Sequence, residues 1–221
     1  MQIQNSFELL SYLKTLDLLD QSPSWWWPNY GSFEVVVGAI LTQNTRWENV
    51  QKSLQNLHSS KILQNQNEED LISLCRSDDK ILASLIAPSG FANQKSKRLI
   101  LLATNILEEF GNFESFVNNV SAEWLIAQKG IGAESRDCIL NYACLREVMV
   151  VDRYTQRLLA SLGYEMFTYD EIQNWLMGGL EWGDLNTLYP KEVSLAQIYA
   201  RYHGKIVELG KRGAKDLKDL K

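Results

Sequence analysis

Apolar residues recur every three or four positions along most of the chain, and no stretch alternates apolar and polar residues as a half-buried strand would. The first apolar stripe consists of Phe7, Leu10, Leu13, Leu16 and Leu19. This spacing gathers side chains on one face of an α-helix, whereas a strand requires a period of two. We therefore expect an all-α fold with two helical lobes, because early and late segments both carry such stripes.

Capping residues and glycines divide this pattern into separate helices. Asn112 and Ser121 predict N-caps of short helices, and Gly111 predicts the end of the helix before them. Thr45 and Glu48 have the Thr-x-x-Glu spacing of a capping box, which predicts a helix that starts there. The expected longer helices cover about 32–43, 45–57, 81–86, 95–110, 133–146, 169–177 and 192–209, and one more follows Asp152.

The composition is that of a soluble globular protein. The 221 residues are 45% hydrophobic and 22% charged, enough for one large domain or two small lobes. No apolar run approaches the ~18 residues of a membrane span, and the N-terminus lacks a signal-peptide pattern. We therefore expect a cytoplasmic protein that does not associate with a membrane.

The cysteines and histidines give little support for a metal centre. The three cysteines have no CxxC spacing, and the chain adds only two histidines. Cys138 and Cys144 lie in an apolar helical pattern, so we expect buried free thiols. The sequence therefore predicts no metal site.

The net charge of −5 argues weakly against nucleic acid as a partner, but its distribution matters more. Lys95, Lys97 and Arg98 form one basic cluster, and Lys129, Arg136, Arg153 and Arg157 flank a Gly-Ile-Gly turn. A solvated helix face is the favoured explanation for each cluster, and a surface that binds phosphates is the alternative.

The Gly-Ile-Gly turn, residues 130–132, lies between two apolar helical segments. Glycine permits a positive φ and a close approach of the backbone to another surface. The helix N-terminus after the turn presents unpaired N–H groups that suit a phosphate, and Lys129 adds a positive charge. An ordinary connection between two helices remains the alternative.

Three segments together resemble the helix-hairpin-helix DNA glycosylase superfamily. They are the glycine turn followed by Val151-Asp152, the stretch VVVGAILTQNTRWENV, and GFANQKSKRL, and they cover most of residues 33–158. The phrases WWWP, LTQNT, QKGIG and EVMVVD look like those of bacterial 3-methyladenine DNA glycosylases of type III, relatives of endonuclease III. The resemblance implies one two-lobed unit over residues 1–221, with a central lobe at about 35–150 and the hairpin near 122–146. The N-terminal segment and the C-terminal helices would form the other lobe.

The resemblance also implies a function: hydrolysis of the N-glycosidic bond of alkylated purines, chiefly 3-methyladenine, in double-stranded DNA by a monomer without a cofactor. Asp152 would be catalytic, although by its position alone it caps a helix. The hairpin residues Lys129, Gly130, Gly132 and Ala133 would bind DNA, and Gln43 matches the position that enters the duplex.

Two departures from the superfamily pattern restrict the reaction. Bifunctional members carry a lysine where this chain has Glu134, and a carboxylate cannot form the Schiff base needed for strand cleavage. No cysteine follows Cys144, so the iron–sulfur cluster of many members should be absent. Another base specificity, or a DNA-binding module without catalysis, remains an alternative.

The run Trp25-Trp26-Trp27-Pro28 suggests either core packing or a pocket for a flipped base. A cationic base would gain from an electron-rich indole. The resemblance favours Trp26, Trp27 and Pro28 as pocket residues, with Trp47 opposite them and Lys211 within reach. A charged C-terminal tail is the alternative explanation for Lys211.

Overall fold

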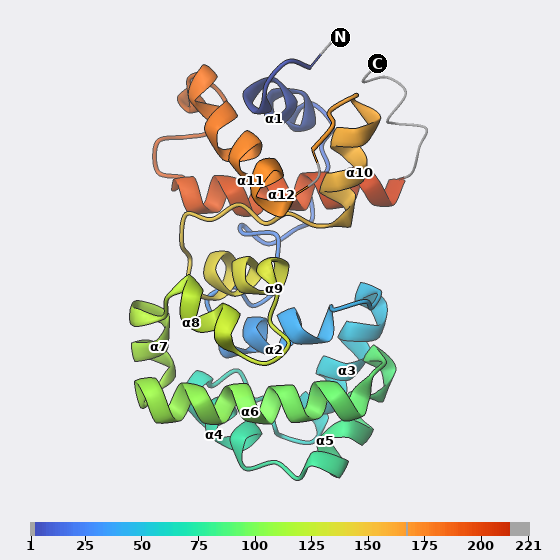
Figure 1. Ribbon diagram of the computed structural model, residues 1–221, viewed down its shortest axis with the longest axis vertical. Helices are drawn as coiled ribbons and strands as arrows, with labels where there is room; N and C mark the ends of the chain where they lie inside the picture. The colour runs from blue at the N-terminus through green and yellow to red at the C-terminus, as the bar shows by residue number, and fades with distance from the viewer. Residues whose placement is uncertain (1–2, 167, 213–221) are drawn as a thin grey trace. The chain divides into compact units, whose positions relative to one another are not determined.

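The computed structural model describes residues 3–166 and 168–212, and this part of the chain contains helices and loops without any β-strand (Figure 1). The all-α prediction is confirmed. The longer helices are α1 (Ser6–Lys14), α2 (Phe33–Leu41), α3 (Trp47–Ser59), α4 (Asn67–Cys75), α6 (Ala92–Phe110), α10 (Arg153–Ser161), α11 (Tyr169–Gly178) and α12 (Leu195–Arg212). The shorter ones are α5 (Asp79–Leu85), α7 (Phe113–Asn119), α8 (Ala122–Ala127) and α9 (Ala133–Cys138).

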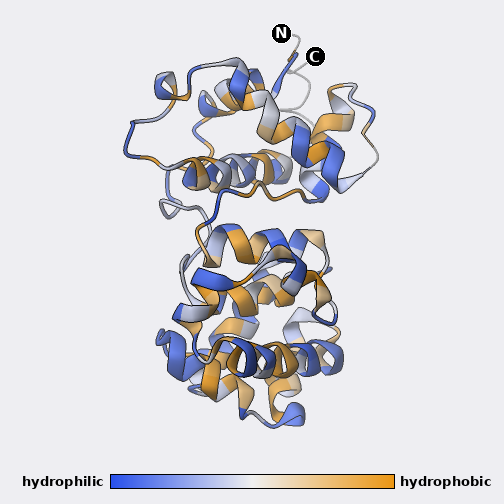
Figure 2. Cartoon of the chain, turned by 60° about the vertical axis from the view of Figure 1, so that its left-hand side comes forward, coloured by the Kyte–Doolittle hydropathy of each residue, from blue (hydrophilic) through white to orange (hydrophobic). Residues whose placement is uncertain are grey.

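The chain divides into two compact units, which we describe separately. Unit 1 comprises Met1–Pro28 and Leu145–Lys221, and unit 2 comprises Asn29–Cys144. Hydrophobic and hydrophilic residues lie on different sides of most helices in both units (Figure 2). Each unit therefore has its own apolar interior.

Unit 1 joins the two ends of the chain. Leu9, Leu10 and Leu13 of α1 are fully buried in a cluster with residues of α10, α11 and α12. The hydroxyl of Tyr202 on α12 donates to the Ser6 carbonyl oxygen at 3.1 Å. The Ser6 hydroxyl donates to the Leu176 carbonyl oxygen on α11 at 2.6 Å. The first helix is thus held by the last two long helices.

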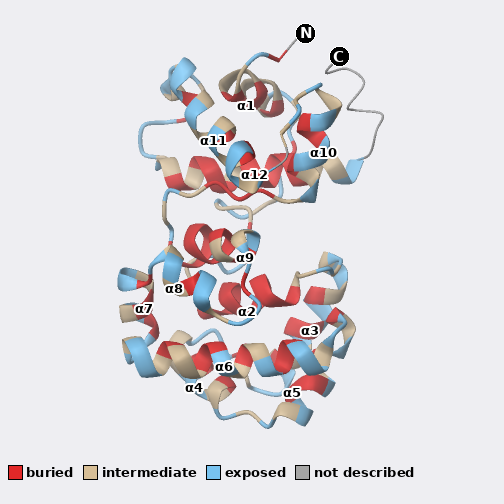
Figure 3. Cartoon of the chain, in the orientation of Figure 1, coloured by how far each residue is buried: buried red, intermediate tan, exposed pale blue. Residues whose placement is uncertain are grey.

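Unit 2 is built around α2, all nine residues of which are buried. Figure 3 shows this helix as buried, and it contacts α3, α4, α6 and α9. The sequence of α2 is apolar on every side, as expected of a helix with neighbours all around it.

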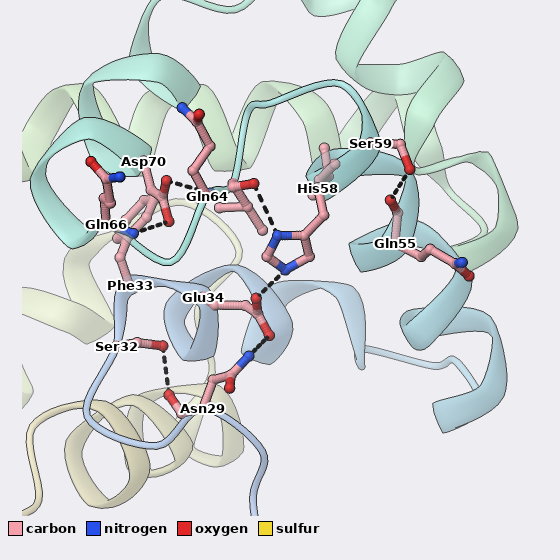
Figure 4. A network of polar contacts seen from close by, with 12 residues as sticks. Asn29, Ser32, Phe33, Glu34, Gln55, His58, Ser59, Gln64, Gln66 and Asp70 are labelled. Carbon is pink, nitrogen blue, oxygen red and sulfur yellow. Dashed lines mark hydrogen bonds and ion pairs between the residues drawn. The ribbon is translucent and has the colours of Figure 1, made fainter.

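One acidic residue interrupts the apolar surface of α2, and a polar network accommodates it (Figure 4). The Glu34 carboxylate lies 2.5 Å from Nε2 of His58 and accepts a hydrogen bond from Asn29 at 2.8 Å. Nearby, buried Asp70 accepts the backbone N–H groups of Gln64 and Gln66. Both carboxylates have protein partners, as buried charges require, so these partners offset the cost of burying them.

Some of the predicted helix caps are confirmed, and one is wrong. Asn112 and Ser121 cap α7 and α8 through their side chains, and Gly111 ends α6 with a φ of 78°, as predicted. The capping box at Thr45 is wrong: α3 has Arg46 as its N-cap, without a side-chain hydrogen bond. The Thr45 hydroxyl instead donates to the Ser89 carbonyl oxygen.

Several observed helices differ in extent from their predictions, and one was not predicted. The helix expected over 133–146 is α9 followed by a π-helical turn, Ile139–Ala143, and ends at Cys144. The last helix begins at Leu195 and reaches Arg212, whereas the pattern predicted 192–209. Helix α4 had no prediction, since its first turn is acidic and its apolar residues are few. Cys138 and Cys144 are buried and form no disulfide, as predicted.

Candidate active site and nucleic-acid interface

Asp152 ends the buried segment before α10 and is the N-cap of that helix. Its Oδ1 accepts the backbone N–H of Thr155 at 2.8 Å and the Thr155 hydroxyl at 2.9 Å. An aspartate in this position satisfies an N–H group that the first helical turn leaves without a partner. The predicted capping role is therefore confirmed, and it uses one of the two carboxylate oxygens.

The second oxygen of Asp152 lies toward α12. Nε2 of His203, which is 3% exposed, is 3.6 Å from Oδ2, an ion-pair distance that is longer than a hydrogen bond. Burial alone would raise the pKa of Asp152. The His203 imidazole and the two hydrogen bonds from Thr155 outweigh burial, so the pKa of Asp152 lies below its ordinary value. This carboxylate is ionised at neutral pH.

Trp26 lies beside this pair, in the same unit. Its ring meets the His203 ring edge-on, with centroids 5.3 Å apart. A side chain at Gly204 would collide with the indole, so α12 approaches Trp26 closely because it has a glycine there. Trp26 has a φ of 66°, unusual for a bulky residue, and backbone strain of this kind is common at functional sites.

Glu208 connects Trp26 with Lys211. Its Oε1 accepts the indole N–H of Trp26 at 3.2 Å and the Lys211 ammonium at 2.9 Å. Nζ of Lys211 lies 6.0 Å from the centroid of the Trp26 ring. Of the predicted pocket residues, Trp26 and Lys211 are thus neighbours within unit 1.

The other predicted pocket residues have different settings. Trp27 is 7% exposed and packs edge-on against Trp26, with centroids 6.2 Å apart. Pro28 is exposed. Trp47 is the half-buried first residue of α3 and belongs to unit 2. A pocket that combines Trp47 with Trp26 and Trp27 therefore draws on both units and stays a prediction.

Two of these neighbours, His203 and Glu208, are not among the site residues that the sequence predicts. A signal was present in the spacing of the last helix. Gly204, Glu208 and Lys211 are separated by four and then three residues, so they lie on one face of α12. Counting helical positions back from Lys211 would have found Glu208. The same count would not have shown that His203 lies next to Asp152, because these two residues are far apart in the sequence.

The hairpin consists of α8, the hairpin turn (residues 128–132) and α9, all in unit 2. Gly130 has a φ of 83°, and the N–H of Ile131 donates to the Gln128 carbonyl oxygen at 3.1 Å. Gly132 is the extended N-cap of α9, and a Cβ there would meet no atom within 4 Å. Lys129 is exposed and Ala133, the first residue of α9, is half-buried. The turn thus presents its backbone outward.

Gln43 contacts the hairpin directly. Its Nε2 donates to the Gly130 carbonyl oxygen and to the Ser135 hydroxyl, both at 2.9 Å. Its Oε1 accepts a hydrogen bond from Nη1 of Arg98 at 3.1 Å. The segment that the resemblance placed in the duplex therefore lies against the turn that the resemblance assigned to DNA binding. Glu134, the second residue of α9, is exposed.

A family model matches residues 37–177, a range that contains Gln43, the hairpin and Asp152. It describes the HhH-GPD superfamily of base excision DNA repair proteins. This chain belongs to that superfamily. A candidate DNA repair glycosylase of Methanocaldococcus jannaschii is 37% identical to it over 213 residues, which are 93% of this chain and 88% of the relative.

Solved structures of superfamily members agree with the fold. The 3-methyladenine DNA glycosylase of H. pylori, bound to 1,N6-ethenoadenine, is 51% identical with a TM-score of 0.92, over 95% of this chain and 98% of that one. A non-covalent endonuclease III–DNA complex has a TM-score of 0.70 at 13% identity, over 95% of this chain and 87% of that one, a likeness of fold alone.

Among residues 3–166 and 168–212, no cluster of three or more His, Cys, Asp or Glu side chains could hold a metal ion. In the same residues, no helix is both long and apolar enough to cross a membrane.

Proposed function

We propose that this protein is a monofunctional DNA glycosylase that hydrolyses the N-glycosidic bond of alkylated purines in double-stranded DNA, chiefly that of 3-methyladenine, and leaves an abasic site. The observation that carries this proposal is the Asp152 carboxylate, which accepts hydrogen bonds from Thr155 and lies 3.6 Å from His203, whose ring packs against the indole of Trp26. The 51% identity with the H. pylori 3-methyladenine DNA glycosylase supports the substrate class.

The reaction needs a fixed negative charge more than it needs an acid. As the bond between C1′ and the base breaks, its electron pair moves to the base and positive charge develops on the sugar. A carboxylate near C1′ stabilises that charge, and it can accept the proton that the attacking water loses. A 3-alkylated adenine is cationic before the bond breaks, so it leaves as a neutral base without protonation. One ionised aspartate is therefore sufficient.

The base pocket that we propose includes Trp26, Trp27, Pro28, Trp47 and Lys211. An alkylated base must leave the stack to react, and its face is then bound by aromatic side chains. The positive charge of the base adds attraction to an indole of roughly 0.5–2 kcal/mol. Glu208, between Trp26 and Lys211, offsets the charge of the lysine and so keeps this side of the site acceptable to a cation.

DNA binding is assigned to the hairpin and to Gln43. Lys129, Gly130, Gly132 and Ala133 would contact the phosphate backbone, and the open space beside Gly132 allows a close approach. Gln43 would enter the duplex beside the flipped base. Glu134 stands where bifunctional relatives carry a lysine, so no Schiff base forms there and the strand stays intact.

The test is base release from methylated duplex DNA under single-turnover conditions, by the wild type and Asp152→Asn. Asparagine caps a helix about as well as aspartate, so the variant should fold and bind DNA. We expect release of free 3-methyladenine by the wild type and a loss of at least about 100-fold in the variant.

Three outcomes would contradict the proposal. Undiminished release by Asp152→Asn would remove the catalytic role of that residue. DNA binding without release by either protein would indicate a non-enzymatic binding module. A strand cleaved without added base or heat would show that the enzyme is not monofunctional.

A further inference from the structure

Unit 2 contains a buried cation that the proposed mechanism does not use. Lys95 of α6 is 1% exposed, and its ammonium donates to the carbonyl oxygens of Leu41 and Ser89 and to the hydroxyl of Thr45, each at 2.8 Å. These three oxygens match the three donors of the ammonium group. Burial, followed by the charge of Arg98, lowers the pKa of Lys95 to about 8, so the group is still largely charged at neutral pH.

The partners of Lys95 surround the Gln43 loop, residues 42–46. Leu41 ends α2, where carbonyl groups lack helical partners and a cation is favourable. Thr45 lies within the loop, and its hydroxyl also reaches the Ser89 carbonyl oxygen. Lys95 therefore ties both ends of the loop to α6. Burial of a lysine is costly unless its hydrogen bonds are made, and here they fix a loop.

Arg98, one turn further along α6, holds the tip of the same loop. Its guanidinium donates to Oε1 of Gln43 at 3.1 Å and fills the space that a side chain at Gly130 would occupy. The Gln43 amide in turn donates to the Gly130 carbonyl oxygen and to Ser135. A single side chain thus contacts both segments to which DNA binding is assigned.

We propose that Lys95 and Arg98 are positioning residues that hold the backbone of the Gln43 loop and the hairpin turn as one preformed surface for DNA, from which the Gln43 side chain exchanges its hydrogen bonds when it enters the duplex. This inference rests on the proposed function, because it concerns the DNA-binding segments of that function. A surface that is ordered before binding loses less conformational freedom when DNA arrives, so it binds more tightly. The role of Arg98 depends on a planar guanidinium that donates to Gln43 while it packs over Gly130, and a lysine cannot reproduce both contacts.

The test compares Arg98→Lys with the matched control Lys97→Met, which removes an exposed charge from the same helix. We expect Arg98→Lys to raise the Kd for a duplex with a tetrahydrofuran abasic-site analogue, and the KM for methylated DNA, by about tenfold or more. The single-turnover rate at saturating DNA and the thermal unfolding midpoint should stay at their wild-type values. Lys97→Met should change Kd by less than Arg98→Lys does, although it removes a full charge.

Hydrogen exchange in the free protein provides a readout that does not depend on DNA. In Arg98→Lys, the Ile131 amide should exchange faster, while amides in the centre of α2 stay protected. Lys95→Met should additionally release the amides of residues 42–46. If Lys95→Met does not fold, Arg98→Lys still decides the proposal.

The results separate this inference from the proposed function. A wild-type protein that releases no base would contradict the glycosylase assignment, while the Kd and exchange measurements would still test Arg98. Wild-type Kd and unchanged exchange at Ile131 in Arg98→Lys would overturn the positioning role. A lower single-turnover rate at saturating DNA in Arg98→Lys, with an unchanged KM, would overturn the positioning role as well.

Discussion

At the scale of the residue, the two oxygens of Asp152 have different neighbours. Oδ1 accepts both hydrogen bonds from Thr155, and Oδ2 faces His203. The contact that begins α10 therefore leaves one oxygen of an ionised carboxylate for chemistry. A residue can be structural and reactive at once when its two acceptor atoms point in different directions.

His203 should influence the acid limit of the reaction. His203→Gln removes the imidazole that helps to lower the pKa of Asp152, so burial is less opposed and that pKa rises. In the proposed mechanism the carboxylate is the active form, so a higher pKa of Asp152 means less active enzyme at a given acidic pH. We expect the acid limb of the single-turnover rate of base release to move to higher pH in His203→Gln.

Thr155→Val provides a graded comparison for His203. It removes the hydroxyl but keeps the backbone N–H that Asp152 accepts, so its acid limb should move in the same direction by a smaller amount. A pH profile of His203→Gln that coincides with that of the wild type would show that the imidazole does not affect the charge of Asp152.

At the scale of the element, the two glycines of the hairpin turn have different tasks. Gly130 has a φ of 83° and packs under Arg98, so Gly130→Ala should lower the free energy of unfolding by roughly 1–2 kcal/mol or more. Gly132 has a φ of −100° and open space, so Gly132→Ala should cost much less stability. The added methyl group should nevertheless weaken DNA binding.

Urea unfolding and duplex-binding titrations of both glycine variants measure these effects. The two measurements should rank the variants in different ways: Gly130→Ala as the less stable protein, and Gly132→Ala as a stable protein that binds DNA poorly. Equal losses of unfolding free energy would contradict the distinction that the backbone angles make.

The elements also show which features local sequence can predict. The caps at Asn112, Ser121 and Asp152 depend on residues three positions away, so their pattern is visible in the sequence. The capping box at Thr45 failed because Lys95 and Ser89, distant in sequence, bind its hydroxyl instead. Asp152 was recognised from its place after an apolar run, whereas its approach to His203 depends on packing between α10 and α12.

At the scale of the whole molecule, a net charge of −5 has to be reconciled with a polyanionic partner. Few phosphate contacts suffice when they are concentrated at one turn, and each contributes about 0.9 to the slope of log K against log salt. Lys129→Ala should therefore reduce that slope by about 0.9. Lys80→Ala, an exposed charge outside the hairpin, should leave it unchanged.

Duplex-binding titrations at several salt concentrations measure these slopes. If Lys129→Ala and Lys80→Ala reduce the slope equally, the DNA contact is spread over the surface of unit 2. If neither variant changes it, the phosphate contact lies elsewhere than at the hairpin.

The hydrogen bonds between Ser6 and Tyr202 join residues 196 positions apart, and this has a consequence during synthesis. Unit 2 is continuous in sequence and can fold while later residues are still being translated. Helix α1 leaves the ribosome before unit 2 does, and well before α12, which supplies part of its packing. At ~5–20 residues per second, the leucines of α1 are synthesised on the order of 10–40 s before the residues of α12 against which they pack. During that interval α1 exposes apolar residues that are buried in the folded protein, so we expect chaperones to bind this segment during synthesis.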